Sequence, residues 1–431
     1  MFMHITPIRL ASAFLPLLAG AGMLNLGLGL QASILGLRAE SESFSVQAIG
    51  AVMAIYYVGF IIGSLKIPRL VDKVGHIRTF SVMASLASAS VLLHAVWISP
   101  WSWALFRGIT GFCLVGMSLV VESWLNEKAR NEERGAVLSI YMMVLLGSTA
   151  MGQLLLTVAS TDGYFLFVVV SVLLSLALLP LALSTRPTPV HVPTKRMRFG
   201  ALMEQSPVGV IGALASGCMS GSFWTLGAVF AKRIGLAPEA IGVFMFCLVV
   251  GGLFSTWPIG RLSDRMDRRF VLIIQAALIL LISVAMHWPG VENSSWIYPL
   301  AFLAGGAVLP VYAVSVALVN DQLKHGEFVP ASATLLLVYG IGATLGPLLA
   351  STSMNFLGPT GLFSLTAVVA LCVGLYAAYR LTIRAPLPSE ELSAFIPTPR
   401  TTAAAYALHP DAEEDTAEEE ATHNNPSTDK L

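Results

Sequence analysis

The chain has 431 residues, of which 55% are apolar and only 12% are charged, and its formal net charge at pH 7 is zero. Soluble proteins carry about 25% charged residues, so this composition excludes an ordinary soluble protein and predicts a lipid-facing exterior. A neutral balance also gives no reason to expect nucleic acid or an acidic partner. Several apolar runs reach the roughly 20 residues that cross a bilayer as a helix, and they are too long for barrel strands. We therefore expect an all-α membrane protein.

The apolar runs predict twelve transmembrane helices. The first apolar run resembles a cleavable signal sequence, but it continues to about Leu37, which is longer than a signal core needs to be. We therefore expect it to be retained as a helix. The predicted helices cover residues 9–36, 46–65, 79–97, 101–123, 135–158, 163–184, 207–231, 238–258, 270–288, 295–319, 330–351 and 360–381. Four cysteines, Cys113, Cys218, Cys247 and Cys372, lie in these runs without a CxxC pair and are expected to be small apolar packing residues.

The breaks between the helices divide the chain into four parts. Residues 1–184 and 207–383 are predicted as two six-helix halves, joined by a Pro-rich, basic cytoplasmic loop at 185–206. Residues 384–431 carry seven acidic residues between Asp411 and Glu420, and their composition predicts a disordered tail. Short and charged breaks alternate strictly. With both termini in the cytoplasm, 21 of the 25 Lys and Arg residues lie on the cytoplasmic side, which fixes the orientation by the positive-inside rule.

A charged segment of ten residues, which we call the charged decade, interrupts the apolar sequence twice. The copies are RLVDKVGHIR at 69–78 and RLSDRMDRRF at 261–270. The offset of 192 residues places each copy between the second and third helix of its half, and it aligns Asp72 with Asp264. An internal repeat of this kind predicts two equivalent halves. Two parallel halves are typical of transporters that alternate access by rocking about a site between them, near the middle of the membrane.

The decades resemble the loop motif of the major facilitator superfamily, Gly-x-Leu-x-Asp-Arg-x-Gly-Arg-Arg. The first copy has Pro68 in place of the first glycine, and the second has Asp267 in place of the second glycine. The stretch VESWLNEKARNEERGAVLSIYMMV also resembles a bacterial branch of that superfamily, the YcaD-like transporters. The resemblance covers about residues 8–382. It implies the twelve-helix fold of two pseudo-symmetric bundles, in a monomeric, multi-pass protein of the inner cell membrane that moves a small solute without a cofactor.

The charged decades predict a cytoplasmic gate. When that side is shut, Asp72 and Asp264 are expected to pair with charged residues of neighbouring helices, and several weak pairs together bias a two-state balance. Topology alone would explain the basic residues, but it does not explain the repeated aspartate. Glu127 and Arg134, seven residues apart, add a match to a Glu-x6-Arg-Gly motif of sugar porters. The predicted gate residues are Arg69, Asp72, Lys73, Gly75, Arg78, Glu127, Arg134, Gly260, Arg261, Asp264, Arg265, Arg268 and Arg269.

Polar residues inside the membrane are few, so each is a candidate for substrate or coupling contact. Arg107 lies about seven residues, or ~10 Å of helical rise, inside the fourth helix, and could bind a carboxylate or phosphate. The structural alternative is that it satisfies backbone carbonyls, holds helices together or snorkels to the interface. Gln31 and Asn25 of the first helix lie at similar or greater depth.

Glu122 lies near the cytoplasmic boundary of the fourth helix, where partial burial suits a proton carrier. A gate partner of Arg69 or Arg130 is the alternative we favour. Further candidates for the cavity lining, although such residues also pack helices, are Gln153, Trp224, Tyr56, Tyr57, Tyr312 and Tyr339. Because Glu122 is the only clear proton carrier, facilitated diffusion without proton coupling stays open.

The alternatives to a secondary transporter are a membrane enzyme and a non-transporting sensor or scaffold of the same fold. The eight histidines form no HxxxD or HExxH pair, so we predict no catalytic residues and no metal site. The expected partners are a small-molecule substrate, protons and membrane lipid. The sequence names neither the substrate nor the direction of transport.

Overall fold

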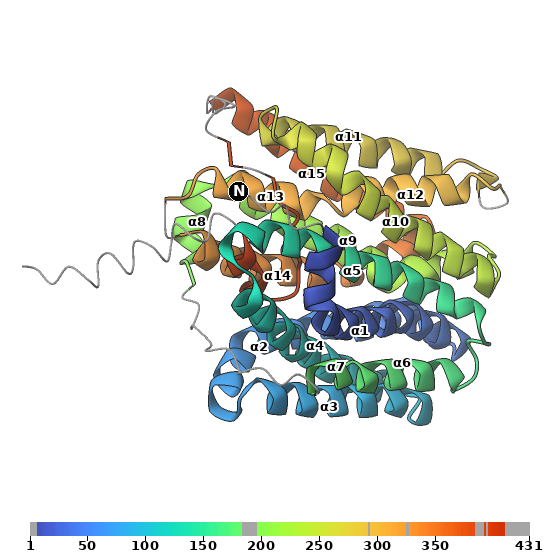
Figure 1. Cartoon of the computed structure of the whole chain (residues 1–431). Helices are drawn as coiled ribbons and strands as arrows, with labels where there is room; N and C mark the ends of the chain where they lie inside the picture. Colours follow the sequence, from blue (N-terminus) through green and yellow to red (C-terminus); the bar gives the residue numbers. More distant parts are fainter. Residues whose placement is uncertain are drawn as a thin grey trace, which may run out of the picture.

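The computed structural model describes residues 7–182, 196–291, 294–324, 327–383, 392–393 and 395–409, with side chains from residue 14 onward. All regular elements in these ranges are helices, most of them long and packed side by side (Figure 1). Eleven of them are long and apolar enough to cross a membrane, and Phe165–Leu181 forms a shorter apolar helix. Large apolar side chains such as Trp101, Leu281 and Phe356 point outward, as a lipid-facing surface requires.

In the described residues of its first half, the chain forms seven α-helices. They are α1 (Pro7–Ser41), α2 (Val46–Val74), α3 (His76–Val96), α4 (Pro100–Lys128), α5 (Arg134–Leu154), α6 (Phe165–Leu176) and α7 (Leu179–Ala182). Two single 3-10 turns flank α5, at Asn131–Glu133 and Leu155–Thr157.

The described part of the second half contains eight α-helices and the 3-10 helix named last below. They are α8 (Phe199–Gln205), α9 (Pro207–Arg233), α10 (Pro238–Ser263), α11 (Arg268–Met286), α12 (Ile297–Val308), α13 (Val311–Asn320), α14 (Phe328–Leu357), α15 (Gly361–Ile383) and the 3-10 helix η5 (Ala403–Leu408). The predicted helix 295–319 is broken at Leu309 and Pro310, and α8 lies in what was predicted as a loop.

The repeat seen in the sequence is also seen in the packing. A side chain at Gly111 of α4 would collide with the backbone of Tyr56 in α2, and one at Gly305 of α12 would collide with Leu248 in α10. Tyr56 and Leu248 are separated by the same 192 residues as the two charged decades. Small residues let membrane helices approach closely in both places.

Both charged decades begin as helix. The second predicted helix was expected to end at 65, but α2 continues through Pro68, Arg69 and Asp72 to Val74. Gly75 then has φ +86°, which side-chain-bearing residues rarely adopt, and α3 begins at the next residue. In the second copy α10 continues to Ser263, and a short turn leads to α11. We call the end of the bundle that carries Asp72 and Asp264 the motif end.

The two halves are joined directly at the opposite end. Arg233 Nε of α9 lies 2.9 Å from Glu40 Oε1 of α1. Lys232 Nζ donates to Ser41 Oγ at 2.7 Å and to the carbonyl of Leu37 at 3.1 Å. Gly36 packs against Val229 of α9 as well. This end of the bundle is closed.

At the motif end, a segment from beyond α15 lies between the halves. Residues 392–393 and 395–409, which we call the C-terminal segment, contact α4, α5 and α14 through η5 (Figure 1, red). Tyr406 and Leu408 are fully buried there. The prediction of a disordered tail is therefore wrong for these residues, because their apolar and hydroxyl side chains find partners inside the bundle. The other residues of 384–431 lie outside the described part of the chain.

Candidate functional site

A cavity of about 220 Å³ lies between the two halves, bounded by α1, α2, α4 and α5 on one side and by α9, α10 and α14 on the other. Part of the C-terminal segment, Pro397–Thr401, completes its wall. The side chains that give the cavity its polar and aromatic character are Gln31, Tyr56, Tyr57, Arg107, Trp224 and Tyr339. It is a mostly apolar pocket with a few convergent polar groups, the usual form of a small-molecule site.

Arg107 is the most exceptional group in this cavity. Its side chain is only 4% exposed, and its Cζ lies 4.4 Å from the centroid of the Tyr56 ring. The close packing of α2 on α4 at Gly111 brings the two residues together. Within the described ranges Arg107 forms no ion pair, and its buried Nε has no hydrogen-bond partner. A cation–π contact compensates only part of the cost of burying a charge.

Gln31 adds a second unsatisfied group to the same cavity. It is 1% exposed, and neither its amide nitrogen nor its amide oxygen has a hydrogen-bond partner among the described residues. Asn25 also lines the cavity, but its amide donates to the carbonyl of Ala21 at 2.8 Å. Buried polar groups in proteins are nearly always hydrogen-bonded. Gln31 and Arg107 are therefore available to a ligand.

Aromatic rings form much of the remaining wall. Tyr56 and Tyr57 meet edge to face with ring centroids 5.1 Å apart. Trp224 and Tyr339, both predicted from the sequence, line the cavity from α9 and α14. The cavity thus combines a cation with flat apolar surfaces.

Arg400 is the cavity residue that sequence reasoning missed. Its guanidinium donates to the carbonyl of Leu309 and lies 5.4 Å from the ring centroid of Tyr339. It was overlooked because it belongs to a segment expected to be disordered. One signal was present: Arg400 is the only Lys or Arg between residues 385 and 429, and it stands next to the apolar run AAAYAL.

Glu122 is fully buried but does not line the cavity. The hydroxyl of Tyr141 donates to its Oε1 at 2.9 Å, and the hydroxyls of Thr401 and Thr402 donate to its two oxygens. Of the two partners proposed from the sequence, Arg130 pairs with Glu133 at 2.5 Å instead. In this structure the C-terminal segment takes the place of the predicted basic partner.

Gln153 and Tyr312 also lie outside the cavity lining. Gln153 ties α5 to α1, because its amide nitrogen donates to the carbonyl of Gly29 at 2.9 Å and its oxygen accepts from Ser33 Oγ at 2.5 Å. The hydroxyl of Tyr312 lies 2.5 Å from that of Tyr406. Both act here as packing residues, and their contact with a substrate stays a prediction.

The first charged decade lines a second cavity of about 240 Å³ at the motif end. Arg69, Asp72 and Arg196 lie there beside Thr402–Ala404 of the C-terminal segment. Arg196 donates to the carbonyl of Ser64 at 2.6 Å, and burial followed by the charge of Arg69 lowers its pKa. Within the described ranges no hydrogen bond or ion pair of Asp72 is found, and its gate contact stays a prediction.

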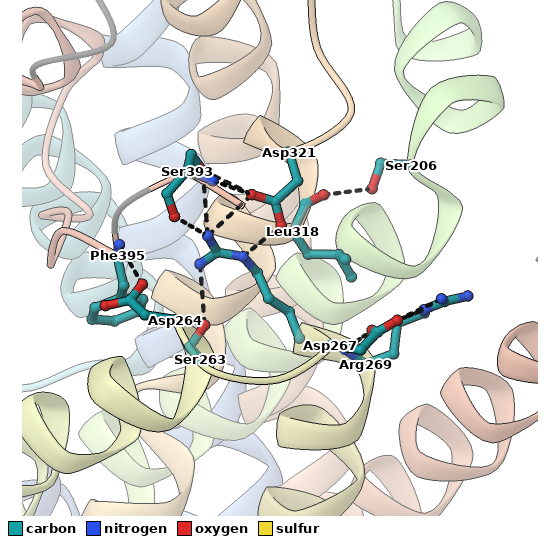
Figure 2. Close-up of polar contacts among 10 residues, drawn as sticks. Ser206, Ser263, Asp264, Asp267, Arg269, Leu318, Asp321, Ser393 and Phe395 are labelled. Carbon is teal, nitrogen blue, oxygen red and sulfur yellow. Dashed lines mark hydrogen bonds and ion pairs between the residues drawn. The ribbon is translucent and has the colours of Figure 1, made fainter. Parts of the chain in front are cut away.

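The second charged decade forms a buried polar cluster (Figure 2). Arg268 binds Asp321 of the loop after α13 through two hydrogen bonds, Nε to Oδ2 at 2.5 Å and Nη2 to Oδ1 at 3.0 Å. Both side chains are at most 1% exposed. The hydroxyl of Ser393 donates to Asp321 Oδ1 at 2.8 Å, and the amide of Phe395 donates to Asp264 Oδ1 at 2.8 Å. Figure 2 shows both contacts. The gate residues of this half therefore hold the C-terminal segment.

The remaining predicted gate residues lie on the helix ends around these clusters. Arg261 stacks on Trp257 at 3.7 Å, Arg269 pairs with Asp267 at 2.6 Å, and Gly260 faces the ring of Phe395. Lys73, Arg78, Glu127 and Arg134 lie on α2, α3, α4 and α5, and Arg265 lies in the turn before α11. Their roles in gating stay predictions.

The family model of the Major Facilitator Superfamily matches residues 10–325 and 210–409 of this chain. The uncharacterized MFS-type transporter YcaD of Salmonella paratyphi A is 29% identical over 373 residues, covering 86% of this chain and 94% of the relative. YcaD of Escherichia coli O6:K15:H31 is 29% identical over 357 residues, covering 82% of this chain and 92% of the relative.

Solved structures share the fold. The nucleoside transporter NupG superposes with a TM-score of 0.72 at 11% identity, covering 86% of this chain and 99% of NupG. A bacterial homologue of the human lysosomal transporter Spinster, in an inward-facing and occupied conformation, gives a TM-score of 0.66 at 16% identity, covering 97% of this chain and 98% of the homologue. With its apolar helices, its repeated motif and these matches, the chain belongs to the Major Facilitator Superfamily and is a multi-span membrane transporter.

Proposed function

We propose that this protein is a secondary transporter of a small organic anion with an aromatic or apolar body, working by alternating access between its two halves. The single observation that carries the substrate class is Arg107, a buried guanidinium with no carboxylate partner in the described ranges. An anion bound to it would supply the missing charge, and a carboxylate or phosphate matches guanidinium geometry. The unsatisfied amide of Gln31 and the rings of Tyr56 and Trp224 support a ligand with both polar and flat apolar parts.

The motif end is assigned to the cytoplasm. Of the 25 Lys and Arg residues, 21 lie on that side when the helices alternate in direction, and Arg38, Lys232 and Arg233 lie on the other. Basic residues accumulate in cytoplasmic loops of membrane proteins. In a bacterial inner membrane the Arg233–Glu40 pair then closes the periplasmic side.

Alternating access requires that this closed end opens while the motif end closes. The contacts of Arg233 and Lys232 with α1 must break in that change. Asp72, which has no partner among the described residues in this state, is proposed to form its gate contact only in the other state. Interactions that exist in one state alone are those that set a conformational balance.

For coupling we propose Glu122 as the proton carrier, since it is a fully buried carboxylate within the described ranges. Its distance from the cavity lining means that any coupling to the substrate is indirect, through α4 or the C-terminal segment. A facilitated-diffusion uniporter is the alternative and would need no such group.

Transport by purified protein in liposomes tests the proposal. A panel of radiolabelled monocarboxylates, aromatic carboxylates and phosphate monoesters would be compared with uncharged analogues of the same size. For any anion that is carried, Arg107→Gln should lower the affinity by about 10- to 100-fold, the effect of losing a charged hydrogen bond of about 1.5–3 kcal/mol. Arg107→Lys should restore part of it.

Arg38→Gln is the matched control, because Arg38 of α1 pairs with Glu42 in the turn directly after that helix, and neither residue lines the cavity. The anion proposal would be refuted if the unmodified protein carried the neutral analogues and the Arg107→Gln variant carried them with the same kinetics. Saturable binding of an anion without flux of any compound would instead favour the alternative of a non-transporting sensor of the same fold.

A further inference from the structure

We propose that the C-terminal segment is an autoinhibitory plug, which fills the opening of the cavity at the motif end and keeps the two halves apart there. The plug consists of residues 392–393 and 395–409. This inference goes beyond the proposed function and does not depend on the identity of the solute.

One face of the plug binds α4. The hydroxyls of Thr401 and Thr402 donate to Glu122, and Asn126 donates its amide to the carbonyl of Ala404 at 2.5 Å. Glu122 and Asn126 are one helical turn apart, so the plug follows the inner surface of α4 near its end. Apart from the plug, Tyr141 is the only described residue whose side chain donates to the carboxylate of Glu122.

The other face of the plug binds the second half of the chain. The hydroxyl of Tyr406 meets that of Tyr312 in α13 at 2.5 Å, and Arg400 donates to the carbonyl of Leu309. Ser393 and Phe395 are held by Asp321 and Asp264, as Figure 2 shows. The plug therefore links the two halves at the end where they must approach each other.

The plug is buried like a core element. Tyr406 and Leu408 are fully buried, and Thr398, Thr402 and His409 are each 3% exposed. A chain end resting on a surface would leave these side chains open to water. Pro397–Thr401 reach further and form part of the cavity wall, with Arg400 beside the ring of Tyr339.

Two consequences follow from this position. The motif end cannot close while η5 lies between α4 and α14, because packed helices do not interpenetrate. A solute cannot use that end either, since the plug fills the path between the cavity and the motif-end surface. The plug must leave before each cycle, and a protein that keeps it bound is locked in the present state.

Electron spin resonance distances test this without any substrate. Spin labels would be placed at Arg130 and Lys324, exposed positions at the motif end on the two halves, after replacement of the four cysteines. The full chain should give one population at the present separation. A chain ending at residue 391 should show a second, shorter population, with the ratio of the two shifted by about tenfold or more, as expected from the loss of one or two net hydrogen bonds.

A synthetic peptide of residues 392–409, added to the truncated protein, should restore the single population. Identical distance distributions in the full and truncated chains would overturn the proposal, and so would a peptide that leaves the truncated protein unchanged. Because no solute is used, failure of this test is distinct from failure of the proposed anion transport.

A full-length variant separates release of the plug from damage by truncation. Thr401→Val with Thr402→Val removes both hydroxyls from Glu122 while keeping the size of the side chains. Tyr406→Phe removes only the hydroxyl that meets Tyr312. The double threonine variant and Tyr406→Phe should both shift the distances between the spin labels toward the shorter population, as truncation does. Tyr379→Phe, on an exposed face of α15, is the matched control and should leave them unchanged. If the threonine and Tyr406 variants behave like that control, the plug does not keep the two halves apart at the motif end.

Discussion

Thr402 donates its hydroxyl to Glu122, although the two residues are 280 positions apart in the sequence. Glu122 is fully buried in α4, and the adjacent Thr401 donates to its other oxygen. The carboxylate that was the best candidate for a proton carrier is thus held by the C-terminal segment. Release of that segment changes the surroundings of Glu122, so gating and proton coupling would share this residue.

The first prediction concerns proton coupling through Glu122. Glu122→Gln keeps the shape and the acceptor oxygen but cannot bind and release a proton. In liposomes containing a pH-sensitive dye, the unmodified protein should move protons together with its solute. The variant should exchange solute at equilibrium without any change in internal pH. If both proteins carry solute and neither moves protons, the chain is a uniporter.

The second prediction concerns the buried pair of Arg268 and Asp321. Arg268→Ala should lower the free energy of unfolding by about 3–5 kcal/mol, because it leaves a buried carboxylate without its counter-charge. Replacing both residues, as Arg268→Met with Asp321→Leu, should cost less than either single change for the same reason. Thermal unfolding in detergent measures all three.

Arg130→Ala is the control for that series. Arg130 pairs with Glu133, but its side chain is 64% exposed. Water screens an exposed pair, which therefore contributes little to stability, so the melting temperature should change little. A loss as large as that of Arg268→Ala would contradict the role of burial.

Much of this fold could be predicted from the apolar runs and the repeated decade. In lipid a long apolar segment must form a helix, because only then are its backbone polar groups hydrogen-bonded. The 192-residue offset is visible again in the helix packing at Tyr56 and Leu248. The helix ends could not be predicted, because charge was interpreted as the end of a helix. Arg69 and Asp72 instead continue α2 beyond its apolar part, and only Gly75 ends it.

The candidate site was also predictable in part from the apolar runs, because polar residues within them stand out. Arg107 and Gln31 stand out because polar residues in an apolar run are costly, and both line the cavity. Gln153 and Tyr312 carry the same signal, yet they are satisfied by Gly29 and Tyr406. Only the three-dimensional partners separate a ligand-binding polar residue from a packing one. The tail was misjudged because the composition of 384–431 as a whole hides the short apolar run AAAYAL at 403–408.

The third prediction uses the asymmetry between the two motif aspartates. Asp264 accepts from the amide of Phe395 at 2.8 Å, whereas Asp72 lines the second cavity. Asp264→Ala should therefore loosen the plug, and the same change in a chain ending at residue 391 should have a much smaller effect. Asp72→Asn should slow the change of state to a similar degree in both backgrounds while leaving ligand affinity unchanged. Transport rates of the four proteins provide the comparison, and equal responses of both aspartates to truncation would contradict the asymmetry.

The fourth prediction concerns the closed end, where Arg233 Nε lies 2.9 Å from Glu40 Oε1. Glu40→Gln weakens a contact that exists only while this end is shut, so the protein should open there more often. Both side chains are partly exposed, at 29% and 18%, so the expected change is about 0–1 kcal/mol, or up to about fivefold in the population of the open state.

A cysteine introduced at Gln31 in the cavity reports this opening when a membrane-impermeant maleimide is added from the closed side. Its modification rate should rise in Glu40→Gln and fall again in the charge-swapped pair Glu40→Arg with Arg233→Glu. Glu42→Gln is the matched control, because Glu42, in the turn directly after α1, pairs with Arg38 of α1 at 2.6 Å and this pair does not link the halves. An equal rise in that control would mean that surface charge, rather than the contact between α1 and α9, sets the rate.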